Sequence, residues 1–284
     1  PAPPPGRAPP PPPSKYYSAG PAPAPPDLIT LRGSRLLGRV PMVLYAGSLV
    51  PAEMLQHCRA DAEILDTAEL SLDQQEACYR RARDADLDVA RLHSGDPAIY
   101  GATAEQMRRL EALGIDYEIV PGVSSFTAAA AVLGSELTRP AVSQSVILTR
   151  VSGRASAVPE RESIARFAEH QATMCIFLSG QRLKQTVADL LLHYPADTPV
   201  ALVRRASWPD QTIHRATLAT LLGGVRQKDW LLTTLLLVGP ALSRDGGIES
   251  SLYAAGFTHL FRDGSDRKKP RVRRRTAPAA EDAK

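Results

Sequence analysis

Short apolar runs along this chain alternate with longer segments in which apolar residues recur every three or four positions. The runs, each bounded by turn residues, predict buried strands, and the periodic segments predict amphipathic helices. In the first half the two kinds alternate, which is typical of a parallel sheet with helices on both faces. Strands are predicted at 15–17, 42–45, 64–66, 86–91 and 117–120, and helices at 31–37, 51–57, from 71, 104–114 and 127–133.

Residues suited to helix ends support this prediction. Asp27 and Ser71 are expected to cap helix N-termini through their side-chain oxygens. Pro51 suits the first position of a helix because it lacks an N–H that would need a partner. Gly114 and Gly134 stand where C-terminal caps belong.

The pattern changes near residue 140 and predicts a second α/β domain with a mixed sheet. The predicted fold class is therefore α/β, with two α/β domains and a cleft between them, the default place for a ligand. We expect an N-terminal domain at 15–140 and a C-terminal domain at 141–262. In the latter, strands are predicted at 146–149, 174–178, 200–203, 211–214 (antiparallel) and 233–238, helices at 183–193 and 218–222, and a polar loop at 150–159.

The charge of the chain is concentrated in one tail. The 284 residues carry a formal net charge of +4, and residues 266–284 hold eight basic and three acidic residues, or +5, which leaves −1 for the remainder. We therefore predict a basic disordered tail at 263–284 and a Pro-rich disordered tail at 1–14. A near-neutral body argues against a nucleic-acid partner, and no apolar run is long enough to span a membrane.

Several chemistries lack their sequence signals. The cysteines are widely spaced with no Cys-x-x-Cys pair, which favours a reducing cytoplasm over a disulfide framework. The six histidines have no metal-ligand spacing, so no metal is predicted. A Gly-x-Ser-x-Gly elbow, a phosphate-binding P-loop and a Gly-x-Gly-x-x-Gly turn after the first strand are all missing.

Three turns rich in small residues follow predicted strands: Gly20-Pro21, Gly95-Asp96-Pro97 and Gly122-Val123-Ser124. The carboxyl ends of parallel strands meet at one edge, where open α/β sheets bind ligands. An edge with so few charges suits a nucleoside without phosphates, held mainly by backbone groups. Arginines that follow strands of the second half have the fork geometry that binds carboxylates. They are Arg150, Arg154, Arg204 and Arg205.

Over about residues 15–262 the chain resembles the tetrapyrrole (corrin/porphyrin) methyltransferases. The resemblance rests on Asp27–Gly33, the Gly95-Asp96-Pro97 turn, Pro121–Phe126, Arg205-Ala206-Ser207 and Leu237–Pro240. Leu44–Val50, His93–Pro97, Ser143–Arg150 and Arg205–Asp210 are most similar to the branch that methylates carbon 11 of precorrin-4.

The resemblance implies two α/β domains of the class III methyltransferase type and a homodimer. It implies S-adenosylmethionine as cofactor, with S-adenosylhomocysteine as product, and a tetrapyrrole with acetate and propionate arms as substrate. The implied cofactor-binding residues are Pro21, Ser94, Gly95, Asp96, Ile99, Ser124, Ser125, Leu178, Ala206 and Thr234. For the substrate we expect Ser48, Arg150 and Arg205, and for catalysis Tyr45, His93 and Arg205.

One departure from the family pattern leaves alternatives open. The family's first loop is normally Gly-x-Gly-Pro-Gly, whereas Ser18 and Ala22 replace the first and third glycines here. One alternative is a sibling enzyme acting on another precorrin or on uroporphyrinogen, and a second is a tetrapyrrole- or nucleoside-binding relative that has lost catalysis through the altered 18–26 loop. A nucleic-acid methyltransferase that works through the basic tail is the remaining alternative.

Overall fold

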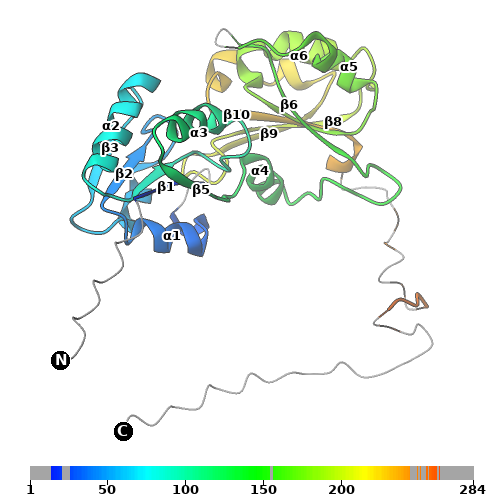
Figure 1. Ribbon diagram of the computed structural model, residues 1–284. Helices are drawn as coiled ribbons and strands as arrows, with labels where there is room; N and C mark the ends of the chain where they lie inside the picture. Colours follow the sequence, from blue (N-terminus) through cyan, green and yellow to red (C-terminus); the bar gives the residue numbers. More distant parts are fainter. Residues whose placement is uncertain are drawn as a thin grey trace, which may run out of the picture.

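The computed structural model describes residues 14–20, 26–153, 156–243, 248, 250, 254, 256–260 and 262. Two five-stranded sheets lie side by side, each covered by helices (Figure 1). The predicted tails, apart from Ser14 at the end of the first, lie outside the described residues, and so do Pro21, Ala22 and Arg154. No helix of the described residues is long and apolar enough to cross a membrane.

The first sheet is entirely parallel, in the strand order β3-β2-β4-β1-β5, so the predicted parallel sheet is confirmed. Strand β1, the first in the chain, lies between β4 and β5. Its strands are β1 (Lys15–Ala19), β2 (Met42–Tyr45), β3 (Glu63–Asp66), β4 (Val89–Leu92) and β5 (Asp116–Val120).

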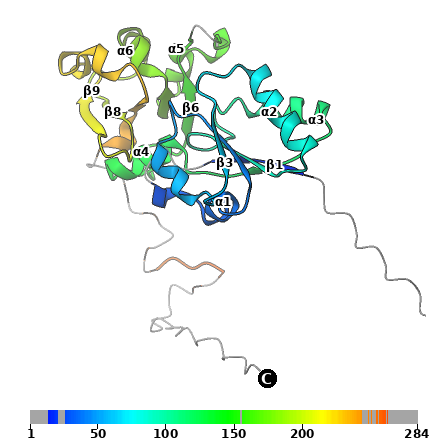
Figure 2. The ribbon, with the colours of Figure 1, turned by 90° about the vertical axis from the view of Figure 1, so that its left-hand side faces the viewer.

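Helices cover both faces of this sheet, because neighbouring side chains of each strand point to opposite faces. Helix α1 (Leu31–Leu37) packs on one face, against Ala90 and Leu92. Helices α2 (Leu72–Asp84) and α3 (Thr103–Ala112) cover the other, where Val89 lies (Figure 2). All carboxyl ends of the strands therefore remain open at one edge.

The second sheet is mixed, as predicted, in the order β6-β7-β10-β8-β9: only the β6–β7 pair is parallel. Helices α5 (Ile164–Ala168) and α6 (Leu183–Leu190) pack on one face. Helix α4 (Ser125–Leu133) packs on the other, although it follows β5 of the first sheet, and so it joins the two halves. The strands are β6 (Val146–Arg150), β7 (Thr173–Phe177), β8 (Pro199–Arg204), β9 (Thr212–Thr217) and β10 (Thr234–Val238).

Local signals located most helix ends. Ser71 and Gln74 form a reciprocal capping box at the start of α2, as its sequence allows. Gly114 and Gly134 have positive φ (67° and 58°) at the ends of α3 and α4. The prediction that Asp27 caps α1 is wrong: Thr30 is the cap, and its hydroxyl accepts from the N–H of Gly33 at 3.1 Å.

Two segments differ from the expected pattern. The helix predicted at 218–222 does not form, and the N–H groups of Leu218 and Ala219 donate to the carbonyl oxygens of Thr198 and Ala196. Only the one-turn 3-10 helix Leu221–Gly223 remains there. Residues 51–57, predicted as a helix that starts at Pro51, form the 3-10 helix Ala52–His57 with Pro51 as its N-cap.

Candidate active site

The three glycine turns meet at the open edge of the first sheet, as predicted. Gly20 follows β1, Gly95 follows β4 and Gly122 follows β5. A Cβ on Gly122 would lie 2.3 Å from the carbonyl oxygen of Gly20 and 2.4 Å from that of Gly95. Since real Cβ atoms do not approach backbone so closely, the three turns are in direct backbone contact and leave no room for side chains.

Asp96 ties two of these turns together. One of its carboxylate oxygens accepts from the N–H of Ala98 at 2.8 Å, and the other accepts from the N–H of Gly122 at 3.0 Å. The next residue, Pro97, accepts at its carbonyl from the Thr103 hydroxyl at 2.7 Å, at the start of α3. Both oxygens of the predicted cofactor residue Asp96 therefore hold backbone in place, and the edge is preorganised.

A cavity of about 440 Å³ lies between this edge and the second sheet. That volume falls within the range of small-molecule sites. Its described walls are mainly apolar, and among them Arg205 alone is charged. Eight residues predicted for cofactor or substrate line it together: Ser48, Ser94, Ile99, Ser125, Leu178, Arg205, Ala206 and Thr234.

Other predicted residues lie beside the cavity rather than in its described lining. Gly95, Asp96 and Ser124 form the edge itself, and Ser124 is the N-cap residue of α4. Arg150 lines a neighbouring cavity of about 120 Å³, where it donates to the Ser156 hydroxyl at 2.7 Å. Arg205 therefore belongs to the described lining of the cleft, whereas Arg150 lies outside that lining but close enough for its charge to act on Tyr100 in the cleft wall.

Tyr45 is the last residue of β2, and His93 directly follows β4. Tyr45 packs against the core beside α1, and its carbonyl accepts from the N–H and hydroxyl of Thr67 at 2.8 and 3.0 Å. Burial, reinforced by the positive charge of Arg91, lowers the pKa of His93 to about 3. The imidazole is therefore neutral near pH 7 and has no proton to donate as an acid.

Arg205 is held in a defined position at the mouth of the cavity. Its guanidinium stacks on Trp208 with the carbon 4.0 Å from the ring centroid, and it donates to Asp210 at 2.6 Å. An arginine fork has five donors, so this ion pair leaves several free for a ligand carboxylate. Arg204, also predicted at the cleft, lies 3.6 Å from the same Asp210 carboxylate.

Strained backbone gathers around this cavity. Tyr100, Leu178, Arg205 and Thr233 all line it, and each has a positive φ, of 56°, 55°, 49° and 49° respectively. Such a conformation costs a residue with a side chain about 1–3 kcal/mol and is concentrated at functional sites. The surrounding structure therefore maintains the shape of this cleft against local preference.

Sequence reasoning missed most of the apolar wall. Tyr100 and Phe177 meet edge to face across the cleft with ring centroids 4.9 Å apart, one from each half of the chain. Burial raises the pKa of Tyr100, which opposes ionisation of its hydroxyl. Tyr100 and Trp208 lie next to the motifs that contain Gly95 and Ser207, and this was the one sequence signal that pointed to them. Further wall residues not predicted are Leu49, Gln181, Val203, Leu231, Leu232, Thr233 and Leu235.

Comparisons with known proteins point to one group. The family model described as Tetrapyrrole (Corrin/Porphyrin) Methylases matches residues 16–222. The precorrin-4 C(11)-methyltransferase of Pseudomonas aeruginosa is 49% identical and covers 87% of this chain and 98% of its own length. The cobalt-precorrin-4 C(11)-methyltransferase of Methanocaldococcus jannaschii is 41% identical, over 87% of this chain and 96% of its own.

Similar solved structures come from the same group of enzymes. The X-ray structure of a cobalamin biosynthetic enzyme, cobalt precorrin-4 methyltransferase, has a TM-score of 0.77 at 40% identity, and covers 81% of this chain and 96% of its own. Uroporphyrin-III C-methyl transferase from Thermus thermophilus, complexed with S-adenyl homocysteine, has a TM-score of 0.68 at 26% identity, over 81% of this chain and 99% of its own.

Proposed function

The chain belongs to the tetrapyrrole (corrin/porphyrin) methylases, and on that premise we propose that it transfers a methyl group from S-adenosylmethionine to carbon 11 of precorrin-4. The observation that carries the proposal is one cavity that unites the preorganised glycine edge with Arg205. The similarity to precorrin-4 C(11)-methyltransferases, 49% identity over nearly their whole length, supports the choice of substrate.

The residues at the edge fit the cofactor. On the side of this edge the described lining, Ser94, Ile99 and Ser125, has hydroxyl groups, backbone and an apolar side chain, as expected for a nucleoside that carries no phosphates. We propose that Ser94, Ile99 and Ser125 hold one side and that the second sheet supplies the other through Leu178, Ala206 and Thr234. When bound, S-adenosylmethionine supplies an electrophilic methyl group. Pro21, proposed to complete the site, lies outside the described residues.

On the substrate side, Arg205 binds a carboxylate arm of the ring. Its guanidinium is already oriented by Trp208 and Asp210, so little side-chain freedom is lost when the substrate arrives. Ser48 and the apolar wall around Tyr100 face the same space and exclude water from it. Arg150, one cavity away, is proposed to reach a second, outer arm.

Catalysis by this site is mainly positioning. The attacking ring carbon is electron-rich, so the transfer needs no strong base. Holding two reactants in line supplies about 7–11 kcal/mol in favourable cases. His93, with a pKa of about 3, is neutral near pH 7 and is proposed, like Tyr45, to steer the ring rather than to move a proton.

The experiment is a coupled assay. The purified full chain is incubated with S-adenosylmethionine and enzymatically prepared precorrin-4, and product mass and the site of the new methyl are determined. Methylation at carbon 11 supports the proposal. Methylation of uroporphyrinogen or another precorrin instead would make the chain a sibling enzyme, and S-adenosylhomocysteine binding without turnover on any ring would make it a non-catalytic relative.

The proposal extends to the setting of the enzyme. Three free cysteines, Cys58, Cys78 and Cys175, fit a reducing cytoplasm, and the family resemblance supports a homodimer of chains with domains at 15–140 and 141–262. Light scattering at the concentration used for the assay tests the dimer. Fractionation of cells that express the chain tests the location.

A further inference from the structure

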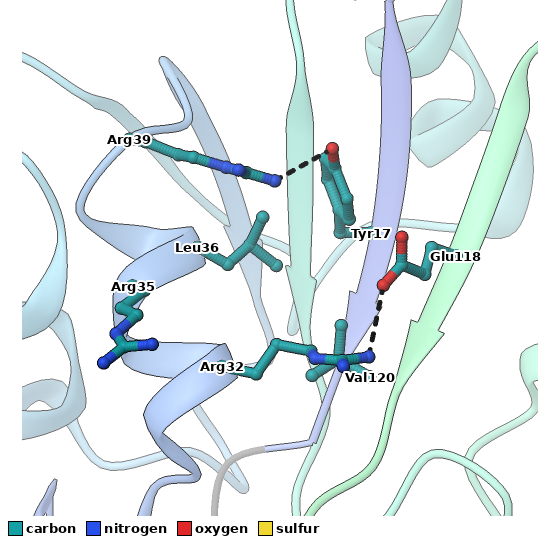
Figure 3. Close-up of a pocket in the computed structure, with 7 residues that line it drawn as sticks. All are labelled: Tyr17, Arg32, Arg35, Leu36, Arg39, Glu118 and Val120. Carbon is teal, nitrogen blue, oxygen red and sulfur yellow. Dashed lines mark hydrogen bonds and ion pairs between the residues drawn. The ribbon is translucent and has the colours of Figure 1, made fainter.

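A second cavity lies on the face of the first sheet that α1 covers, away from the methyl-transfer cleft. It has a volume of about 300 Å³ and is open to solvent between α1 and the edge strand β5. Figure 3 shows Arg32 of α1 reaching toward Glu118 of β5 and Arg39, which follows α1, reaching toward Tyr17 of β1, whereas Arg35 points away from both strands. None of its lining residues is used by the proposed methyl transfer.

Three arginines dominate this cavity. Arg32, Arg35 and Arg39 are spaced three and four residues apart, which places them on one side of α1 and of the turn that follows it. Leu36, between them, faces the sheet and is buried. Helix α1 and the turn after it therefore supply one buried leucine and three arginines to the lining of the cavity.

Only part of this positive charge is balanced. Glu118 of β5 is the one acidic residue among the described lining, and it lies 2.9 Å from Lys15 and 3.6 Å from Arg32. The hydrogen bond from Lys15 also lowers the pKa of Glu118, so this carboxylate stays ionised. Three arginines thus share the described lining with one acidic residue, a formal excess of two positive charges.

The arginines differ in what they contact. Arg39 donates to the hydroxyl of Tyr17 at 3.1 Å and stacks on its ring, with 5.4 Å to the centroid. Arg35 has no hydrogen bond or ion pair with any described residue. Its side chain is exposed, and none of its donors is used by a residue that the structure describes.

We propose that this cavity binds a small anion with at least two negative charges, carried by carboxylate or phosphate groups. Guanidinium groups bind both through paired N–H donors, and three arginines line this cavity. The ring of Tyr17 and the side chains of Leu36 and Val120 form an apolar floor that suits an organic body. A bound anion also reduces the mutual repulsion of the arginines.

The cavity is close to the cofactor edge along the chain. Val120 lines it and is followed by Pro121 and Gly122, the turn that Asp96 holds. The hydroxyl of Thr30, the cap of α1, donates to the carbonyl of Pro121 at 3.5 Å. The anion site and the cofactor turn therefore both adjoin strand β5, but different residues line the two cavities.

The test uses citrate and pyrophosphate as probes, titrated into the full chain at constant ionic strength, with chloride as the reference anion. We expect one-site binding by calorimetry and a concentration-dependent rise in Tm with at least one probe. The anion that binds more tightly identifies carboxylate or phosphate as the natural group. Binding of neither probe at millimolar concentration overturns the proposal.

Variants separate a built site from general attraction of anions. Arg35→Gln, at an exposed position with no partner to lose, is expected to weaken probe binding about tenfold or more, which is 1.4 kcal/mol. The matched control is Arg108→Gln, an exposed arginine of α3, which should leave the affinity unchanged. Equal affinity in the wild type and Arg35→Gln means general attraction only and overturns the site.

The methyl-transfer proposal is tested independently. S-adenosylhomocysteine affinity is expected to stay within about twofold in Arg35→Gln. Loss of anion binding with intact S-adenosylhomocysteine binding supports a separate site. If the variant loses both together, the cavity is not a separate site and the inference fails.

Discussion

The backbone N–H of Arg205 donates to the carbonyl oxygen of Thr233 at 2.9 Å, and both residues have a positive φ of 49°. Arg205 follows β8 and Thr233 precedes β10, so this bond extends the antiparallel pairing of the two strands by one residue. The Arg205 side chain then leaves the sheet at the mouth of the cleft, where Trp208 and Asp210 hold it. The positive φ of Arg205 and its ion pair with Asp210 together hold its guanidinium at the mouth of the cleft.

The first prediction concerns that guanidinium. Arg205→Ala should raise the substrate KM, since loss of a charge-assisted hydrogen bond costs about 1.5–3 kcal/mol. S-adenosylhomocysteine affinity should change little, because the cofactor edge does not use the Arg205 side chain. Steady-state kinetics with precorrin-4 and calorimetry with S-adenosylhomocysteine separate the two effects. A collapse of cofactor affinity would show that its assigned role is wrong.

The second prediction compares two glycines of the open edge. Gly95 has a φ of 79°, but a Cβ there would have no neighbour closer than 3.7 Å, so Gly95→Ala should cost about 1–2 kcal/mol of unfolding free energy from backbone strain alone. In Gly122→Ala the Cβ meets two carbonyl oxygens, and the turns must separate.

Gly122→Ala should therefore lose more stability than Gly95→Ala and should also lose S-adenosylhomocysteine binding. Urea unfolding and calorimetry on both variants provide the measurements. If the two variants were equally stable, the close backbone contact of the three turns would not describe the protein in solution.

The third prediction concerns the pH dependence of stability. His93 has a pKa of about 3 in the folded chain and about 6.5 when unfolded. Between these values the unfolded chain binds the extra proton, so unfolding becomes easier as the pH falls below 6.5. The slope is about 1.4 kcal/mol per pH unit, and from pH 6.5 to 5.0 the loss is about 2 kcal/mol.

His93→Gln removes the titrating group and keeps a polar side chain of similar length. Urea unfolding at pH 7.5 and pH 5.0 should show the smaller stability loss in the variant. Parallel pH profiles for the wild type and the variant would mean that His93 is accessible to protons in the folded state.

The fourth prediction concerns thiol reactivity. Cys175, in the middle of β7, is fully buried, and burial raises its pKa to about 12. At pH 8 it should remain unmodified by iodoacetamide in the folded chain and react once urea unfolds the protein. Cys78, which is partly exposed on α2, should react first. Mass spectrometry of timed digests gives the order, and early labelling of Cys175 would contradict the packing of the second sheet.

Sequence patterns located the strands because each buried strand is a compact apolar run. They also placed the three glycine turns at one edge, because the carboxyl ends of parallel strands lie at the same edge of the sheet. They failed where tertiary contacts compete with local preference. Thr30 rather than Asp27 caps α1, and the segment 218–222, expected to be a helix, forms only the 3-10 helix Leu221–Gly223, while Leu218 donates its N–H to Thr198.

The sequence predicted the residues on the cofactor side of the cleft better than the residues of its apolar wall. Ser94 and Ala206 belong to turns with recognisable motifs, and both line the cavity. Leu231 and Leu232 have no such motif, and only the folded chain brings them to the mouth. The positive φ of Thr233 and Leu178 could not be anticipated either, since neither residue type favours it.

The central position of β1 constrains how the chain can fold during its synthesis. Tyr16 pairs with Val89 on one side and with Tyr117 on the other, so both partners are translated long after it. Such distant pairing slows folding, and until β5 leaves the ribosome the apolar strand has no complete sheet to enter. A chain stalled before residue 120 would expose β1, and we expect chaperones to engage the nascent protein over this interval.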